Sequence, residues 1–150
     1  MSMFEGEFQA LQAIETIFPG FTPTPLLLSR TSSAAMIVTK YYDLSTLECT
    51  KKDIQCELGR KLALMHQKTS ENGQFGFPVS TFCGSTEQPN FWMDSWIDFW
   101  CERRLGLMKR LLSHDRVVVN QLEKLMDRCE DLFDGCDDIF PSLLHGDLCK

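Results

Sequence analysis

Only two stretches of the chain carry the pattern of β-strands, and both lie within the first 40 residues. Residues 26–29 and 35–40 are rich in apolar side chains, and the turn-forming segment 30–33 separates them. A two-stranded sheet is marginal in water unless a helix or further strands pack on it. The sequence therefore predicts a small antiparallel sheet that depends on its neighbours for stability.

Most of the remaining sequence has the apolar spacing of α-helices. Four stretches show it: residues 2–18, 53–65, 96–112 and 118–133. Pro19-Gly20 is expected to end the first helix, and Asp53 is expected to cap the second. The segment 70–84 is rich in turn-forming residues and predicts an ordered loop. A helix with a small sheet, followed by a mainly helical unit, is an α+β arrangement of two lobes.

The chain is acidic, with 15 Lys and Arg against 21 Asp and Glu and a net charge of −6. This balance argues against a protein that binds nucleic-acid phosphates, which requires a basic face. Apolar residues make up 43% of the chain, which is enough for a core, yet no apolar run is long enough to span a bilayer. We therefore expect a folded protein that binds neither nucleic acid nor membrane.

The seven cysteines stand singly, and no CxxC pair occurs among them. This spacing supports neither a zinc ribbon nor a thioredoxin-type site. An odd number of isolated cysteines fits reduced thiols, and the first residues lack the basic and apolar regions of a secretory signal. The expected location is cytoplasmic.

A histidine, a glycine and an aspartate follow the apolar stretch 139–144 near the end of the sequence. A carboxylate held rigidly beside an attacking hydroxyl group is what a phosphotransferase needs. Gly146 allows a tight turn, His145 can anchor the loop through its ring nitrogens, and Asp147 is the candidate catalytic base. The alternative is an ordinary polar turn in which the Asp147 carboxylate is solvated.

Three blocks of the sequence together resemble the fructosamine (ketosamine) 3-kinase family: Phe4-Glu5-Gly6-Glu7, the stretch 76–104 and Leu144-His145-Gly146-Asp147-Leu148. The middle block is the most specific, and its matching residues are Phe75, Gly76, Phe77, Cys83, Gly84, Gln88, Asn90, Trp92, Trp96, Phe99, Arg104 and Leu105. That family is related to the aminoglycoside and choline kinases. The resemblance implies an α+β, truncated protein-kinase-like fold, with a partial N-lobe sheet in residues 1–44 and a partial, mainly helical C-lobe in residues 45–150.

The resemblance also implies a binding site for ATP. Glu7 matches the helix glutamate that pairs with a strand lysine holding the ATP phosphates in kinases. Lys40, Tyr41 and Tyr42 stand where the family's hinge meets the adenine edge, although an acidic residue is usual at the position of Lys40. The alternatives are an exposed first-turn acid for Glu7 and a plain strand-to-helix connector for the segment 40–42.

A ketosamine pocket is implied in the middle block. Four side chains are expected to line or support it: Gln88, Asn90, Trp92 and Trp96. Amide and indole groups offer neutral hydrogen bonds and stacking faces that suit a polyol. The alternative is a loop that two tryptophans pack on the C-lobe. Arg104 is expected to be a structural ion-pair partner.

The activity implied by the resemblance is transfer of the ATP γ-phosphoryl group to the 3-hydroxyl of a ketosamine, with Mg²⁺ bridging the phosphates. Substrates would be small ketosamines or glycated proteins, and phosphorylation would lead to deglycation. Compared with the family's pattern, the sequence starts at the helix of Glu7 and ends three residues after Asp147. It therefore contains neither the phosphate-binding lysine nor the metal-binding asparagine. We expect no ATP turnover by this chain alone, and the alternative function is an inactive fragment or interaction module.

Overall fold

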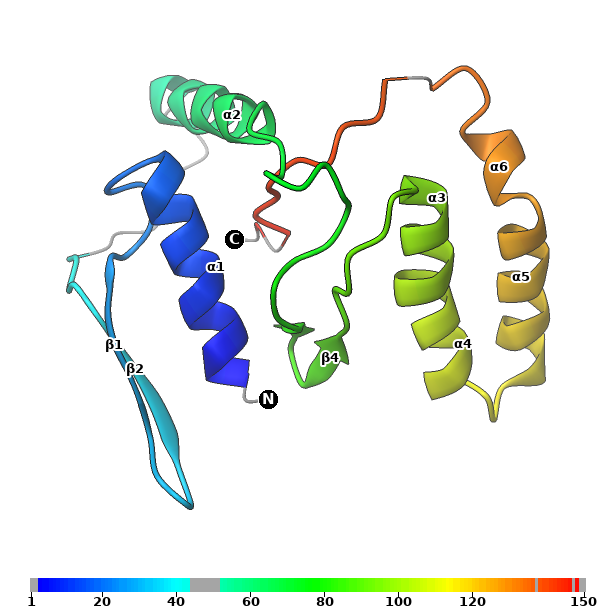
Figure 1. The fold of residues 1–150 in the computed structure, drawn as a ribbon, viewed down its shortest axis with the longest axis horizontal. Helices are drawn as coiled ribbons and strands as arrows, with labels where there is room; N and C mark the ends of the chain where they lie inside the picture. Colours follow the sequence, from blue (N-terminus) through cyan, green and yellow to red (C-terminus); the bar gives the residue numbers. More distant parts are fainter. Residues whose placement is uncertain (1–2, 44–51, 137, 147, 149–150) are drawn as a thin grey trace.

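The computed structural model describes residues 3–43, 52–136, 138–146 and 148. Figure 1 shows helix α1 and the β1–β2 hairpin on the left and helices α4 and α5 on the right. A middle section of extended chain and the short hairpin containing β4 lies between these two sides. The segment 138–146 returns to this middle section.

Helix α1 spans Met3–Ile17 and confirms the first predicted helix within the described residues. Gly6 is buried where α1 meets strand β3 (Thr81–Cys83), and a Cβ atom at Gly6 would lie 2.6 Å from the carbonyl oxygen of Ser80. Past the helix end, Gly20 has a φ of 76°, and its N–H donates to the Glu15 carboxylate at 2.9 Å. A glycine is therefore needed at both places, first for close packing and then for the turn.

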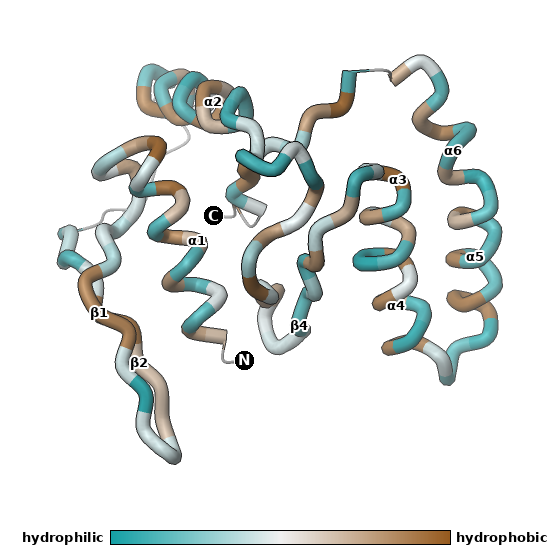
Figure 2. The backbone as a smooth tube through the Cα atoms, viewed as in Figure 1, coloured by the Kyte–Doolittle hydropathy of each residue, from teal (hydrophilic) through white to brown (hydrophobic). Residues whose placement is uncertain are grey.

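Strands β1 (Pro25–Arg30) and β2 (Ala35–Thr39) pair antiparallel, as the sequence predicts. Thr31 closes the turn, because its N–H donates to the carbonyl oxygen of Ala34 at 2.8 Å. Within the described part of the chain, this sheet contains these two strands alone. Its apolar side chains remain largely exposed, and Figure 2 shows β1 as a brown stretch of the tube.

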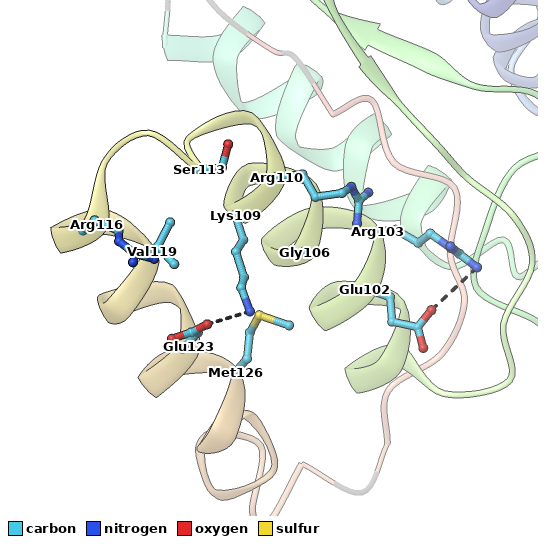
Figure 3. A pocket seen from close by; sticks show the side chains of 10 residues that line it. All are labelled: Glu102, Arg103, Gly106, Lys109, Arg110, Ser113, Arg116, Val119, Glu123 and Met126. Carbon is cyan, nitrogen blue, oxygen red and sulfur yellow. Dashed lines mark ion pairs between the residues drawn. The ribbon is translucent and has the colours of Figure 1, made fainter.

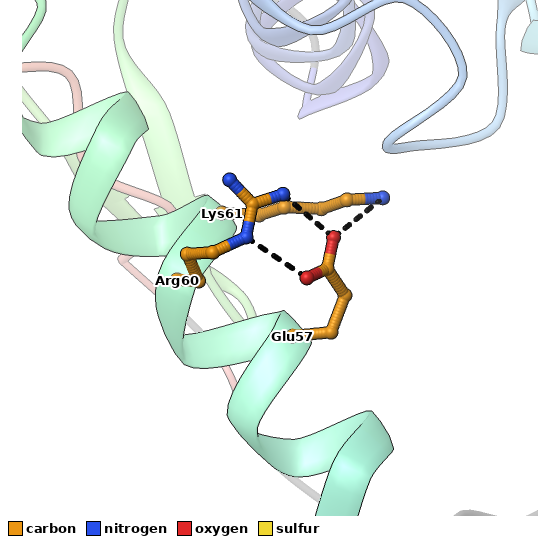
Figure 4. A network of polar contacts seen from close by, with 3 residues as sticks. All are labelled: Glu57, Arg60 and Lys61. Carbon is orange, nitrogen blue, oxygen red and sulfur yellow. Dashed lines mark hydrogen bonds and ion pairs between the residues drawn. The ribbon is translucent and has the colours of Figure 1, made fainter.

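Helix α2 spans Lys52–His66, so Asp53 lies within its first turn and not at the N-cap that the sequence predicts. Met65 near its end is fully buried, whereas most of the helix is exposed. On the exposed face the Glu57 carboxylate accepts two hydrogen bonds from Arg60, at 2.8 and 2.9 Å (Figure 4). This contact with Arg60 lowers the pKa of the Glu57 carboxyl because it favours the charged form.

The predicted loop over 70–84 contains strand β3, which pairs antiparallel with β4 (Thr86–Gln88). The loop prediction is therefore wrong for its last residues. Gly84 lies in the turn between the strands with a φ of 58°. Strands of three residues are too short for an alternating apolar pattern to become visible in the sequence.

The predicted helix over 96–112 forms as three consecutive segments. They are α3 (Trp96–Phe99), the π-helical segment η1 (Trp100–Leu105) and α4 (Gly106–Leu111). The N–H of Gly106 donates to the carbonyl oxygen of Cys101, five residues earlier, as a π-helix requires. The sequence thus predicts the helix but not its widened turn.

The last predicted helix, over 118–133, is divided in two. It consists of α5 (Arg116–Asp127) and the short α6 (Cys129–Leu132), with a break at Arg128. Asp115 caps α5, because its carboxylate accepts the N–H groups of Val117 and Val118 at 3.0 and 3.1 Å. The cap explains why α5 begins two residues before the apolar pattern.

The fold buries few side chains completely. Among the described residues the buried apolar ones are Ile14, Met65, Phe99, Leu105 and Cys129. The accessible surface is 10812 Å², compared with about 7,800 Å² for a compact protein of this mass. The arrangement is therefore open. No helix in the described ranges combines the length and apolar character needed to cross a membrane.

Candidate active site

The segment before the His-Gly-Asp motif is anchored by backbone hydrogen bonds to the chain just after α2. The Ser70 N–H donates to the Pro141 carbonyl at 2.8 Å, and the Leu143 N–H donates to the Lys68 carbonyl at 3.1 Å. Gly146 has a φ of 80°, a left-handed conformation that favours glycine. The anchored segment therefore leads into a glycine in the left-handed region, and His145 next to it is exposed. The predicted base, Asp147, lies outside the described residues.

Glu7 is exposed on the first turns of α1. Within the described ranges the ion pair made by α1 belongs instead to Glu5, whose carboxylate contacts the Arg30 guanidinium on β1. The structure thus uses one α1 carboxylate to attach the helix to the hairpin. The role of Glu7 in phosphate binding stays a prediction.

The predicted hinge residues follow β2 directly. The Lys40 N–H donates to the Thr24 carbonyl at 2.9 Å, so this donor is already used within the fold. The Lys40 ammonium lies 5.4 Å from the centre of the Tyr42 ring, while Tyr41 is 84% exposed. An adenine edge would have to use the other backbone groups of this segment, and that contact stays a prediction.

Asn90 lies at the centre of a buried hydrogen-bond network and is only 5% exposed. Its side-chain amide donates to the Val79 carbonyl and to the Thr81 hydroxyl, each at 3.0 Å. Its side-chain oxygen accepts a hydrogen bond of 2.6 Å from Arg104. The side chain therefore supports the surrounding loops, and its role in a ketosamine pocket stays a prediction.

Arg104 has no ion pair within the described part of the chain, so the predicted ion-pair role is wrong. The guanidinium donates to the Pro89 carbonyl at 3.0 Å and lies 4.8 Å from the centre of the Phe99 ring. Burial lowers the pKa of Arg104, because the charged form loses hydration. The partners of Arg104 are thus uncharged oxygens and an aromatic ring, where the sequence suggests a carboxylate.

Residues 75–77 and 90–93 run antiparallel to each other. Phe75 and Met93 exchange backbone hydrogen bonds of 2.8 and 2.9 Å, and the Phe77 N–H donates to the Asn90 carbonyl at 2.9 Å. Gly76 lies between these bonds, where a Cβ atom would come within 2.8 Å of the Trp92 indole. The predicted pocket residue Trp92 is therefore packed directly on the backbone of Gly76.

Trp96 belongs to an aromatic cluster. Its ring centre lies 5.6 to 5.9 Å from those of its three neighbours, Phe75, Phe99 and Trp100. These distances are typical of favourable aromatic packing. Trp96 is half-buried in this cluster, and Gln88, at the end of β4, is half-buried too.

The predicted site residues thus fall into separate groups. Asn90 and Trp92 are joined through Gly76 and the 75–77 segment, and Trp96 contacts the same segment through Phe75. Within the described residues, no hydrogen bond, ion pair or ring contact joins this group to Glu7 or to the segment 40–42. Their assembly around one ligand stays a prediction.

A groove of about 620 Å³ lies elsewhere, between the η1–α4 helix and α5 (Figure 3). Its lining residues are Glu102, Arg103, Gly106, Lys109, Arg110, Ser113, Arg116, Val119, Glu123 and Met126. None of the predicted site residues is among them. Across the groove the Lys109 ammonium lies 2.8 Å from the Glu123 carboxylate and lowers the pKa of that carboxyl. The groove thus contains an ion pair between two helices, and none of the motifs found in the sequence lies in it.

The described residues contain no group of three or more His, Cys, Asp or Glu side chains that could hold a metal ion. Mg²⁺ beside nucleotides is usually held by one or two carboxylates together with the phosphates. A Mg²⁺ ion beside a nucleotide therefore does not need a cluster of three protein ligands, and its binding here stays a prediction.

Solved structures show the class of fold. The chain is similar to a "putative fructosamine-3-kinase" from Thermobifida fusca, with a TM-score of 0.75 over 97% of this chain and 48% of that one, at 21% identity. A second such structure, from Haemophilus somnus, gives a TM-score of 0.69 over 91% and 45% of the two chains, at 20% identity. These similarities confirm the predicted partial α+β kinase-like fold.

The sequence comparisons identify the family. The fructosamine kinase family model matches residues 1–150. The chloroplastic protein-ribulosamine 3-kinase of Arabidopsis thaliana is 34% identical over 150 residues, covering 98% of this chain and 45% of that protein. Its counterpart from Oryza sativa subsp. indica is 34% identical over 151 residues, covering 98% and 43%. The chain belongs to the fructosamine kinase family, a family of phosphotransferases, and spans about half the length of the curated relatives that it matches.

Proposed function

We propose that the chain provides part of the active site of an ATP-dependent kinase that phosphorylates the 3-hydroxyl group of ketosamines. The observation that carries this proposal is the match of the fructosamine kinase family model to residues 1–150. The names of the relatives, protein-ribulosamine 3-kinases, indicate sugar-amine adducts as the substrate class. Fructosamine or ribulosamine groups on glycated proteins, and small ketosamines, are the proposed substrates, in a cytoplasmic setting.

The proposed reaction is a phosphoryl transfer. The hydroxyl oxygen at carbon 3 forms a bond to the γ-phosphorus of ATP, the bond from that phosphorus to the β,γ-bridging oxygen breaks, and ADP leaves. The hydroxyl proton passes to the carboxylate of Asp147, the proposed base. The anchored segment 141–143 and the left-handed Gly146 support this role, because a base must be held in a fixed position.

The other predicted residues have supporting roles in this proposal. Glu7 and the backbone of residues 40–42 serve the nucleotide, and Gln88, Asn90, Trp92 and Trp96 form or support the ketosamine pocket. Mg²⁺ is part of the proposal, since it neutralises phosphate charge when bound. Phosphorylation at carbon 3 would make the sugar-amine adduct labile, so the proposed outcome is protein deglycation.

The test is binding and turnover of fructosyl-lysine by the purified chain. Calorimetric titration is expected to show fructosyl-lysine binding more tightly than lysine. Phosphomonoester formation from ATP, followed by ³¹P NMR, separates two outcomes. Turnover that falls by about 10² or more in Asp147→Asn, but not in the exposed control Glu71→Gln, supports a catalytic chain. Binding without turnover supports the alternative of a non-catalytic module. Absence of both would contradict the proposal.

A further inference from the structure

We propose that Arg104 is a positioning residue for the ketosamine pocket, which fixes the place of Gln88 and Trp92 by holding Asn90. The inference rests on the proposed function, since that function assigns Gln88 and Trp92 to the pocket. Arg104 itself is not assigned a contact with substrate. It acts on the pocket indirectly, by holding the segments on either side of the β3–β4 hairpin in place.

The guanidinium of Arg104 holds the chain just after β4 at two points. One terminal nitrogen donates to the Pro89 carbonyl at 3.0 Å, and the other donates to the Asn90 side-chain oxygen at 2.6 Å. These acceptors belong to adjacent residues, and they lie between Gln88 and Trp92 in the sequence. A planar group with several donors in a fork can hold both acceptors at once, which the point charge of a lysine cannot.

Asn90 connects the chain that Arg104 holds to the segment on the other side of the β3–β4 hairpin. Its amide nitrogen donates to Val79 and Thr81, and its backbone carbonyl accepts from the Phe77 N–H. All polar groups of its side chain are therefore used inside the protein, as expected for a side chain that is 5% exposed. A shift of Asn90 would displace the segments before and after the hairpin together.

Trp92 depends on the same arrangement. It packs against Gly76, where even a Cβ atom would lie 2.9 Å from the Trp92 Cα and 2.7 Å from the Asn90 carbonyl oxygen. Two backbone segments approach this closely only while the hydrogen bonds between 75–77 and 90–93 are kept. Trp92 is 36% exposed as a residue, so part of it remains accessible to a ligand.

The π-helical turn η1 places Arg104 for this role. In an α-helix, side chains five residues apart point about 140° away from each other around the axis. Phe99 and Arg104 are five residues apart, yet the guanidinium lies over the Phe99 ring at 4.8 Å. The wider turn brings them to one face, so the buried Phe99 supports the guanidinium from below. π-helical turns occur frequently at functional sites.

The first experiment compares Arg104→Lys with the wild-type chain, using fructosyl-lysine as the probe in calorimetric titrations. Arg104→Lys keeps the positive charge but loses the forked arrangement of donors. We expect the dissociation constant for fructosyl-lysine to rise by about 10-fold, which corresponds to the loss of one charge-assisted hydrogen bond. Arg60→Lys makes the same chemical change on the exposed face of α2 and is expected to leave binding unchanged.

The second measurement reports on position rather than affinity. In a chain labelled with 5-fluorotryptophan, ¹⁹F NMR gives one resonance for each of the three tryptophans, and Trp92→Phe assigns that of Trp92. We expect this resonance to move in Arg104→Lys and to stay in Arg60→Lys. Thr81→Val removes one hydrogen bond of Asn90 without touching Arg104, so it tests the network even if Arg104→Lys unfolds. It is expected to move the same resonance by a smaller amount.

The outcomes separate this inference from the proposed function. Wild-type chain that fails to bind fructosyl-lysine counts against the proposed function, while a moved Trp92 resonance still supports the positioning role. Unchanged binding and an unchanged Trp92 resonance in folded Arg104→Lys would overturn the positioning role. An unchanged Trp92 resonance in Thr81→Val would overturn the claim that the hydrogen bonds of Asn90 fix the position of Trp92.

Discussion

Gly76 shows how one residue can govern the packing of a candidate pocket. It has a φ of 156°, and a Cβ atom there would meet the backbone of both Asn90 and Trp92 at less than 3.0 Å. Because neither neighbour is a flexible side-chain end, Gly76→Ala must displace backbone. We expect it to lower the free energy of unfolding by about 1–3 kcal/mol. Urea denaturation followed by tryptophan fluorescence measures this.

Gly59→Ala is the matched control for that prediction. Gly59 lies in α2 with open space where its Cβ would be, so alanine there should raise the free energy of unfolding by up to about 1 kcal/mol. A Gly76→Ala chain as stable as the wild type would show that the close approach of the two segments is not needed.

Glu123 provides a test of electrostatics at a single residue. Lys109 holds the pKa of its carboxyl below the ordinary value of 4.5 through a hydrogen bond and charge attraction. A lowered pKa in the folded state means that the pair stabilises the fold above that ordinary value, and that this contribution is lost as the pH falls through the folded pKa. NMR titration of the carboxyl carbon should show the pKa rising towards 4.5 in Lys109→Met. It should not change in Lys52→Met, and a Glu123 pKa insensitive to Lys109 would contradict the pair.

At the scale of elements, the contact between α1 and β3 joins the first part of the chain to the hairpin that carries Gln88. Gly6 is the point of closest approach, 2.6 Å from Ser80 for an added Cβ. We expect Gly6→Ala to cost about 1–2 kcal/mol of unfolding free energy, because overpacking outweighs the gain in helix propensity. Hydrogen exchange should become faster at the amides of Thr81–Cys83 while the far-UV dichroism of the helices is kept. Unchanged exchange there would mean that α1 does not hold β3.

The helical elements show where local signals are sufficient. The apolar repeat predicts the start of α5 to within two residues, but the helix ends at Asp127, six residues before the predicted end at 133. The widened turn η1 has no comparable signal. In this turn Arg104 contacts the Phe99 ring and donates to the Pro89 carbonyl, which lies 15 residues earlier in the sequence.

At the scale of the whole molecule, burial divides the five cysteines that the structure describes into two classes. Cys56, Cys83 and Cys136 are exposed, whereas Cys129 is buried and Cys101 is half-buried beside it. Burial, and then the neighbouring Cys129 thiol, raise the pKa of Cys101 to about 12. Because the thiolate is the reactive form, iodoacetamide at pH 8 should label the exposed class at least about 10-fold faster.

Peptide mass spectrometry gives the labelling rate of each cysteine. In urea the two classes should react alike, since the difference comes from the fold and not from the local sequence. Rapid labelling of Cys101 and Cys129 in the native chain would show that η1 and α6 do not stay packed together.

The sequence by itself determined α1, the β1–β2 hairpin, the main helices and the family, because these depend on local periodicity, turn residues and a contiguous motif. Only the tertiary structure decided the β3–β4 hairpin, the break at Arg128 and the π-helical turn. It also replaced the predicted ion pair of Arg104 with uncharged partners and made Asn90 a buried support. The physical reason is that short strands are too short to show a pattern of their own, and that the buried polar network is stabilised by partners 9 to 15 residues away, which no local pattern records.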